Sequence, residues 1–296
     1  LYRPDILHFH DTRAELLSRL WPIHKDIKII RTIHLSSYNY RWTRFANPRR
    51  FAYATIERFL NFHFSDAVIY PSRRGLQDAL RHQYVPSRRA ICIPNGIDLN
   101  PFEVAPDRRT RGNSVPILCT VSRLSPEKNI GLLFDAAALL KKRGHSFQLW
   151  VVGEGPEFSA LEEKANVLGL ASQTRFWGWQ ENVAQILFQA DIFALASWYE
   201  GGRSQAAMEA QAAGLPCVLS DVGDHASMLE EDRGLVFPEG DVHACADRLE
   251  FLLKDSETRQ RMGDNARQFA LHAYNLNVMA DQYRDVYRDL LGGLTG

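Results

Sequence analysis

Short apolar runs alternate with amphipathic stretches along most of this chain. A short apolar run is typical of a strand buried in a parallel sheet, whereas apolar residues three or four positions apart predict a helix with one buried face. Their alternation predicts an α/β fold built from parallel βα units. Strands are expected at 5–10, 27–34, 67–72, 90–94, 116–122, 147–152, 175–178, 190–196, 217–220 and 234–238. Helices are expected at 12–20, 45–62, 73–82, 130–144, after 156, and at 182–189, 205–213, 242–253, 257–273 and 276–291.

Residues 99–114 separate two sets of such units; they are rich in Pro, Asp, Arg, Gly and Asn and lack apolar periodicity. This composition predicts a linker between domains. We therefore expect two Rossmann-like, doubly wound parallel-sheet domains, at 1–104 and 105–275, and a C-terminal helix at 276–296 that packs back towards the first domain. Because the sequence starts with Leu1 and enters a strand almost at once, the first domain is expected to be incomplete.

The composition is that of an ordinary globular protein. The 296 residues are 45% hydrophobic and 24% charged, with no apolar stretch of the length that a membrane span requires and no signal segment at the start. The four cysteines lie mostly in apolar runs without C-x-x-C spacing, which indicates reduced core residues in a cytoplasmic protein. No cluster of metal-ligand residues is visible, so we expect no metal and no resident cofactor.

The net charge is zero, but the two parts of the chain differ in sign. Residues 1–104 carry 16 Lys and Arg against 9 Asp and Glu, and residues 105–296 carry 19 against 26. A basic first part suits an anionic partner or surface, and mutual attraction of the two parts explains the asymmetry equally well. The basic residues follow no nucleic-acid-reading module, so no nucleic acid partner is expected.

A loop, a helix and a strand at 197–223 form the most informative stretch. Gly201 and Gly202 permit a sharp turn after a buried strand, and Ser204 can cap the helix that starts at Gln205. A helix that starts at the carboxyl end of a parallel sheet presents free N–H groups and partial positive charge to anions. The stretch therefore predicts a phosphate site.

Two carboxylates flank this expected phosphate site. Glu200 precedes the turn, and Glu209 lies on the helix among apolar neighbours, where carboxylates are rare unless paired. Acids beside a phosphate are suited to accept hydrogen bonds from sugar or ribose hydroxyls, which indicates a nucleotide-sugar. The competing interpretation is a pair of solvated surface acids, and it applies above all to Glu200.

Arg123 and Lys128 stand in the loop after the first strand of the second domain, where ligands bind in doubly wound folds. A planar guanidinium and a compact ammonium together can neutralise a diphosphate leaving group without a metal. Taken alone, the pair would by default be interpreted as two solvated loop cations. The strand-to-helix turn at Gly153 and Gly155 suits close approach by a ribose or base, although such turns are common.

Taken together, these motifs resemble those of the retaining glycosyltransferases of family 4, which have the two-domain GT-B fold. The resemblance covers nearly the whole chain and rests on the order of the motifs and on their strand and helix contexts. The motifs are Pro94-Asn-Gly-Ile-Asp98, Arg123 with Lys128, Gly153-Glu-Gly155, Phe176-Trp-Gly178, Glu200 with Glu209-Ala210, and Gly214-Leu-Pro216.

The resemblance implies roles in binding a nucleotide diphosphate-sugar donor. Arg123 and Lys128 would hold the phosphates, Glu209 the ribose hydroxyls and Glu200 the transferred sugar, while the turn at 176–178 would contact the base. The residues expected to bind the donor are Arg123, Lys128, Gly153, Phe176, Trp177, Gly178, Glu200, Gly201, Gly202, Arg203, Ser204 and Glu209.

The resemblance also implies catalytic roles. His10 matches a family histidine at the end of a first-domain strand, near the acceptor and the reacting carbon, and a satisfied core histidine is its competing interpretation. His8 is expected on the opposite face of that strand. The expected catalytic residues are His10, Glu200, Arg123 and Lys128.

Two features depart from the family pattern. The family has seven residues between its two glutamates, whereas eight separate Glu200 from Glu209, and we expect Gly201 and Gly202 to absorb the extra residue as a local bulge. Family members also have roughly another half-domain before the strand at Asp5. The chain is therefore expected to be either a fragment or a natural short form.

The implied activity is transfer of a sugar from a UDP- or GDP-linked donor to a glycan or lipid-linked acceptor, with retention and without a metal. The family's front-face route, in which the departing phosphate helps deprotonate the acceptor, is favoured over a covalent intermediate. Two alternatives stay open: a nucleotide-sugar-binding protein without turnover, and a GT-B enzyme of different chemistry, such as an epimerase or a phosphorylase.

An arginine-rich and aromatic segment at 38–53 suggests a location. Arg41, Arg44, Arg49 and Arg50 alternate there with aromatic residues, a composition that suits an anionic bilayer and a lipid-linked acceptor. A helix with one apolar face in the core and its arginines in water is the competing interpretation. The first reading predicts peripheral contact with the inner face of the cytoplasmic membrane.

Overall fold

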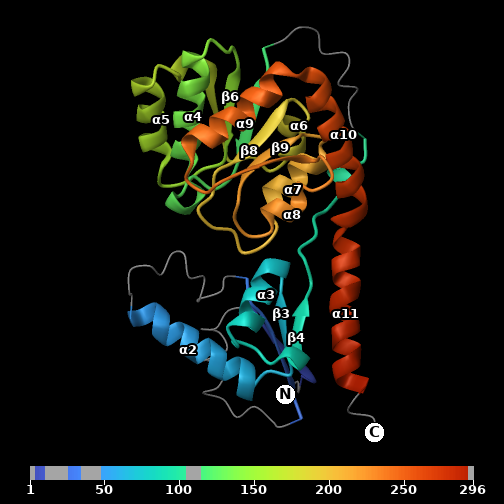
Figure 1. The fold of residues 1–296 in the computed structure, drawn as a ribbon. Helices are drawn as coiled ribbons and strands as arrows, with labels where there is room; N and C mark the ends of the chain where they lie inside the picture. Colours follow the sequence, from blue (N-terminus) through green and yellow to red (C-terminus); the bar gives the residue numbers. More distant parts are fainter. Residues whose placement is uncertain (1–3, 11–25, 35–47, 105–114, 293–296) are drawn as a thin grey trace. The chain divides into compact units, whose positions relative to one another are not determined.

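The computed structural model describes residues 4–10, 26–34, 48–104 and 115–292 (Figure 1). The helix expected at 12–20 lies outside the described residues. So do Arg41 and Arg44, and the side chains of residues 48–53.

The chain divides into two compact units. Unit 1 comprises residues 1–95 and 277–296, and unit 2 comprises residues 96–276. Unit 2 therefore begins before the linker expected at 99–114, because residues after Asn95 already pack against it. The Ile97 N–H donates to the Tyr274 carbonyl at 2.8 Å, and the Phe102 ring is buried.

Unit 1 contains a four-stranded parallel sheet with the strand order β1-β2-β3-β4. Its strands are β1 (Ile6–Phe9), β2 (Lys28–Thr32), β3 (Ala67–Tyr70) and β4 (Ala90–Cys92), and its helices are α2 (Pro48–His63), α3 (Arg73–Arg81) and α11 (Leu276–Gly292). The Ser72 side chain caps α3 by accepting a hydrogen bond from the Gly75 N–H at 3.0 Å.

Helix α11 packs against the sheet of unit 1 although it comes last in the sequence. Its apolar and aromatic side chains cover a buried cluster on β2 to β4, and the Tyr287 hydroxyl lies 2.7 Å from His8 Nδ1. The contacting residues are Met279, Tyr283, Val286, Tyr287 and Leu290 on α11, and Ile30, Ala67, Ile69 and Ile93 in the sheet region.

Unit 2 contains a six-stranded parallel sheet with the strand order β10-β9-β8-β5-β6-β7. Its strands are β5 (Ile117–Val121), β6 (Gln148–Val152), β7 (Thr174–Gly178), β8 (Ile192–Leu195), β9 (Cys217–Ser220) and β10 (Gly234–Phe237). Its helices are α4 (Ile130–Lys142), α5 (Phe158–Val167), α6 (Ala184–Leu187), α7 (Gln205–Ala212), α8 (His225–Met228), α9 (Val242–Lys254) and α10 (Ser256–Ala273).

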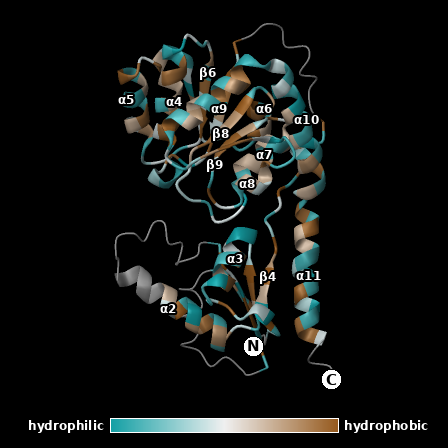
Figure 2. Ribbon diagram, viewed as in Figure 1, coloured by the Kyte–Doolittle hydropathy of each residue, from teal (hydrophilic) through white to brown (hydrophobic). Residues whose placement is uncertain are grey.

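Helices cover both faces of this sheet. One buried cluster joins α4, α5 and α9 to the sheet, and a second joins α6, α7 and α10 to the opposite face. Strands β8 and β9 are fully buried and, apart from Ser220 at the end of β9, apolar (Figure 2), as expected of strands covered on both sides. This arrangement confirms the predicted α/β fold with parallel sheets.

The cysteines also behave as expected. All four are free thiols, and Cys119, Cys217 and Cys245 are buried. Burial raises the pKa of Cys119 to about 12, so its thiol stays protonated near neutral pH. Across the described ranges, no helix combines the length and the apolar character needed to cross a membrane.

Candidate active site

The strand order of unit 2 brings two loops together at the carboxyl edge of the sheet. Strands β5 and β8 pair directly although β6 and β7 lie between them in sequence, which makes their junction a topological switch point. Ligands of open α/β sheets bind beside the loops at such a point. The Trp198 N–H, in the loop after β8, donates to the Glu127 carbonyl, in the loop after β5, at 2.9 Å.

Lys128 and Glu200 form an ion pair between these two loops. Lys128 Nζ lies 2.6 Å from Glu200 Oε1, and their side chains are 23% and 10% exposed. The buried Ser197 hydroxyl donates to the same carboxylate oxygen at 2.8 Å. Glu200 therefore contacts Lys128, the lysine expected to bind phosphate, although eight residues rather than the family's seven separate Glu200 from Glu209.

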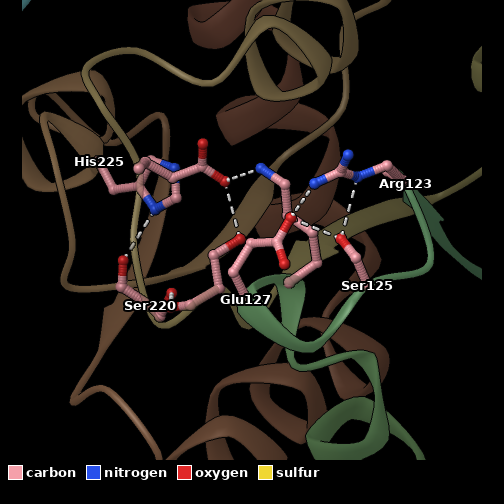
Figure 3. A network of polar contacts seen from close by, with 8 residues as sticks. Arg123, Ser125, Glu127, Ser220 and His225 are labelled. Carbon is pink, nitrogen blue, oxygen red and sulfur yellow. Dashed lines mark hydrogen bonds and ion pairs between the residues drawn. The ribbon is translucent and has the colours of Figure 1, made fainter. Parts of the chain in front are cut away.

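Arg123 is held within its own loop (Figure 3). Its guanidinium donates to the Glu127 carboxylate and to the Ser125 hydroxyl, and that hydroxyl donates to Glu127 at 2.6 Å. Partial burial opposes ionisation of Glu127, but the hydrogen bonds from Ser125 and Arg123 outweigh it and lower its pKa to about 2. The Arg123 side chain is 69% exposed, so its remaining donors face solvent.

Glu209 lies on α7, half-buried between the fully buried residues Met208 and Ala210. Burial raises the pKa of Glu209, and a hydrogen bond from the Gln205 amide at 3.2 Å partly offsets this effect. The expectation of an acid among apolar neighbours is confirmed. Such an acid is suited to accept hydrogen bonds from hydroxyl groups.

The N-terminus of α7 differs from the expected cap. Ser204 occupies the N-cap position and is buried, but its side chain makes no capping hydrogen bond. The N–H groups of the first turn of α7 therefore lack that side-chain acceptor. Arg203, the preceding residue, places its guanidinium carbon 5.2 Å from the centre of the Tyr274 ring.

The turn at Gly201 and Gly202 is closed by a neighbouring loop. Gly202 is buried, and its carbonyl accepts a hydrogen bond from the Asp224 N–H at 3.3 Å. At Gly223, where φ is 54°, an added Cβ would lie 2.7 Å from the Gly202 carbonyl oxygen and 2.9 Å from that of Glu200. Close backbone approach thus occurs at this turn, and Gly223 is the residue that permits it.

The glycine turn after β6 meets the end of β7. Gly153 has a φ of 127°, and an added Cβ would lie 1.9 Å from the Ser122 carbonyl oxygen. Its N–H donates to the Gly178 carbonyl at 2.8 Å. The Glu154 carboxylate accepts a hydrogen bond from the Trp179 N–H at 3.3 Å.

Phe176 and Trp177 point to opposite faces of the sheet, as neighbours on a strand do. Phe176 stacks on Phe134 with ring centres 6.1 Å apart and belongs to the core beneath α4. Trp177 packs edge-on against Trp150 and lies beneath the Arg175 guanidinium at 3.6 Å. The side chains of Phe176 and Trp177 are therefore engaged in packing contacts.

Two further residues near these loops, Trp179 and His225, were not among the residues expected at the site. Trp179, directly after Gly178, is 66% exposed, which is unusual for a side chain of its size. His225 starts the four-residue helix α8 and is fully buried. An aromatic residue after the Phe-Trp-Gly turn is a readable signal, whereas so short a helix has no periodicity to reveal it.

His10 belongs to unit 1, whereas the other candidate residues belong to unit 2. It is exposed, and its Nδ1 lies 2.9 Å from His34 Nε2. The expectation that His8 points to the opposite face is wrong, because the rings of His8 and His10 stack with centres 4.3 Å apart. Residues two apart on a strand share a face.

His8 itself is fully hydrogen-bonded. Its two ring nitrogens contact the Tyr287 and Thr32 hydroxyls at 2.7 and 2.8 Å. Burial, together with the neighbouring His10 and His34, lowers its pKa to about 4, so His8 is neutral near pH 7.

Solved structures confirm the predicted GT-B class of fold. Sucrose-phosphate synthase from Thermosynechococcus elongatus has a TM-score of 0.82 at 22% identity, with 98% of this chain and 74% of that chain covered. HepE from Anabaena, solved with UDP, has a TM-score of 0.80 at 19% identity, with 96% and 79% covered.

The chain belongs to the family described as glycosyl transferases group 1, whose model matches residues 103–269. A second model, described as Glycosyltransferase Family 4, matches residues 1–101. The predicted family resemblance is therefore confirmed over both parts of the chain.

Several curated relatives are glycosyltransferases. The putative glycosyltransferase EpsF of Bacillus subtilis is 33% identical over 225 residues, which cover 66% of this chain and 56% of EpsF. An Escherichia coli UDP-Gal:alpha-D-GlcNAc-diphosphoundecaprenol alpha-1,3-galactosyltransferase is 24% identical over 310 residues, covering 97% of this chain and 76% of that enzyme. This chain thus spans little more than half the length of EpsF.

Replacing Glu209 with Gln is expected to stabilise unit 2 near neutral pH. A carboxylate whose folded-state pKa is raised takes up a proton on folding, so its unfavourable contribution grows as pH rises from about 4.5 through the raised pKa. Thermal unfolding at pH 5 and pH 7.5 should show a gain at pH 7.5 that shrinks at pH 5. The exposed Glu163→Gln is the control, and an equal gain in both variants would contradict the burial argument.

Proposed function

We propose that this chain transfers a sugar from a nucleoside diphosphate donor to a glycan or lipid-linked acceptor, with retention at the anomeric carbon and without a metal. The observation that carries the proposal is the Lys128–Glu200 pair at the switch point of unit 2, next to a helix N-terminus without a side-chain cap. Cations and free N–H groups at that edge suit a diphosphate, and the carboxylate suits a sugar.

The leaving group is the place where charge develops in such a transfer. Lys128 and Arg123 supply two cations, and the N-terminus of α7 supplies N–H groups with partial positive charge. In the part of the chain that the structure describes, no three His, Cys, Asp or Glu side chains are grouped to hold a metal ion. Lys128, Arg123 and the N-terminus of α7 would neutralise the departing diphosphate, which then helps to deprotonate the acceptor in a front-face reaction.

The donor and acceptor are proposed from the relatives and from the site. HepE is solved with UDP and with UDP-glucose, and the name of the Escherichia coli relative states a UDP-linked donor and a diphosphoundecaprenol-linked acceptor. We therefore put UDP-sugars before GDP-sugars, and a lipid-linked glycan first among acceptors. Glu209 is assigned to the ribose hydroxyls, Glu200 to the transferred sugar and His10 to the acceptor side.

Donor binding is the first test. Calorimetry with UDP-, GDP- and ADP-sugars should give one binding donor. Lys128→Ala should lower its affinity about 10- to 100-fold, because a charged hydrogen bond contributes roughly 1.5–3 kcal/mol. Glu209→Ala should also weaken binding.

The matched control is Lys254→Ala, which breaks an ion pair with Glu250 at the far end of α9. Its affinity should equal that of the unmodified chain. An equal loss of donor affinity in Lys128→Ala, Glu209→Ala and Lys254→Ala would count against this donor site. Unchanged donor affinity in Lys128→Ala would also count against it.

Turnover tests the chemistry. With the binding donor and a lipid-linked acceptor, proton NMR of the product should show the anomeric configuration of the donor, at a rate unchanged by EDTA. An inverted product would refute retention, and a rate abolished by EDTA and restored by a divalent ion would refute metal independence. Donor that binds but is never consumed would indicate a binding protein, and an altered free nucleotide-sugar would indicate an epimerase.

Membrane contact is proposed from the arginine-rich segment at 38–53. Co-sedimentation with vesicles of phosphatidylglycerol should fall at least about tenfold when Arg41, Arg44, Arg49 and Arg50 become Gln, since each basic residue near an anionic surface contributes about 1 kcal/mol. Zwitterionic phosphatidylcholine vesicles, which have no net charge, should bind neither protein. Four substitutions elsewhere in unit 1, at Arg73, Arg74, Arg81 and Arg88, form the control. An equal loss there would attribute the binding to net charge alone.

A further inference from the structure

His225 is a buried histidine with one ring nitrogen unused. It starts α8, directly after the loop that closes the turn at Gly202, and its exposed fraction is 0%. Nδ1 lies 2.9 Å from the Ser220 carbonyl (Figure 3), and a carbonyl only accepts, so Nδ1 carries the hydrogen. Nε2 then presents a lone pair, and among the described residues this atom has no hydrogen-bond partner.

Three charged groups act on the His225 ring, and two of them form the ion pair described above. Burial, which has the largest effect, lowers the pKa of His225, and so does Lys128. The Glu200 carboxylate, the Ser220 carbonyl and Asp224, the N-cap of α8, raise this pKa. Hydrogen bonds join the ring to Glu200, because Ser220, whose carbonyl accepts from Nδ1, donates its hydroxyl to the Ser197 carbonyl at 2.8 Å, and Ser197 donates to the Glu200 carboxylate. Because burial outweighs the effects that raise the pKa of His225, the ring is neutral while Lys128 balances Glu200.

A bound diphosphate changes this balance. Lys128 has three N–H donors, and the phosphate oxygens of a donor compete with Glu200 for them. As Lys128 turns to the phosphates, the Glu200 carboxylate, 10% exposed, loses its cation in a poorly solvated place, where an unpaired charge is strongly disfavoured. The added negative charge of the diphosphate acts on His225 in the same direction.

We propose that His225 is a positioning residue whose unused Nε2 takes up a proton when a donor diphosphate draws Lys128 away from Glu200, so that the imidazolium replaces Lys128 as the counter-ion of that carboxylate. This inference rests on the proposed donor site. The proton comes from solvent and stays on Nε2, Nδ1–H keeps its bond to the Ser220 carbonyl, and the Ser197 hydroxyl keeps its bond to Glu200.

The exchange assigns Glu200 a second state. In the free protein its carboxylate is tied to Lys128 and Ser197, and in the complex it is held by His225 and Ser197 while its remaining lone pairs face the transferred sugar. A neutral side chain at position 225 would leave the displaced carboxylate without a counter-ion. Donor binding would then be weaker and would lose its dependence on pH.

The first measurement follows His225 directly in the unmodified chain. Nitrogen-15 NMR of ring-labelled histidine, assigned by comparison with His225→Gln, should show a neutral Nδ1–H ring at pH 7.5. It should change to an imidazolium signal on saturation with the donor identified by the binding panel. A ring that is already charged in the free protein, or neutral in the complex, would overturn the inference.

The second measurement counts protons. Calorimetry of donor binding in buffers of different ionisation enthalpy should show uptake approaching one proton per donor, with affinity rising by up to about tenfold per unit fall in pH between 8 and 6. Nucleotide-sugars are suitable probes because their diphosphate has no ionisation in this range.

His225→Gln should bind more weakly at pH 6 with no proton uptake, whereas the exposed His243→Gln should match the unmodified chain. Donor binding by the unmodified chain without proton uptake would refute the exchange and leave the proposed function standing. If no donor binds, the proposed function fails and the exchange fails with it.

Discussion

The parallel pairing of β5 with β8 is the constraint on which the site depends. The Leu118–Ile192 and Cys119–Phe193 pairs join strands that are separated in sequence by β6 and β7. Because parallel strands all end at one edge, the pairing sets the loops after them side by side. Charged residues that are 72 positions apart in sequence, Lys128 and Glu200, then lie within hydrogen-bond distance.

Backbone packing around these loops then leaves little freedom. Gly153 and Gly223 both hold positive φ angles at places where a Cβ would overlap a neighbouring carbonyl oxygen. The loops after β5 and β6 therefore approach as bare backbone, as do the loops after β8 and β9, and the Trp198 N–H bond to Glu127 joins the two pairs. A rigid backbone holds these loops in place while a ligand competes for their side chains, which is the condition for one ion pair to be exchanged for another.

Apolar periodicity predicted the strands and helices that bury many residues. It failed where the structure depends on a single turn or on the hydrogen bonds of single residues. The strand expected at 217–220 coincides with β9. A short apolar run between Pro216 and a polar loop is typical of a strand that is buried on both faces. Helix α8 was missed because four residues make one turn. Position alone did not determine whether Ser204 makes a capping hydrogen bond, and neither sequence spacing nor composition could reveal that His225 is buried with a ring nitrogen that lacks a partner among the described residues.

A buried ion pair is a poor source of stability, because desolvation consumes most of the attraction. Lys128 and Glu200 are only partly exposed, so their pair adds little to the fold beyond what an apolar contact would. The pair does, however, keep both charges oriented and poorly hydrated before a ligand arrives. A diphosphate that enters the site binds a cation that is already poorly hydrated. The Glu200 carboxylate then loses its counter-ion and needs another partner. His225, which is buried and keeps one ring nitrogen without a partner among the described residues, is the group proposed to supply that partner.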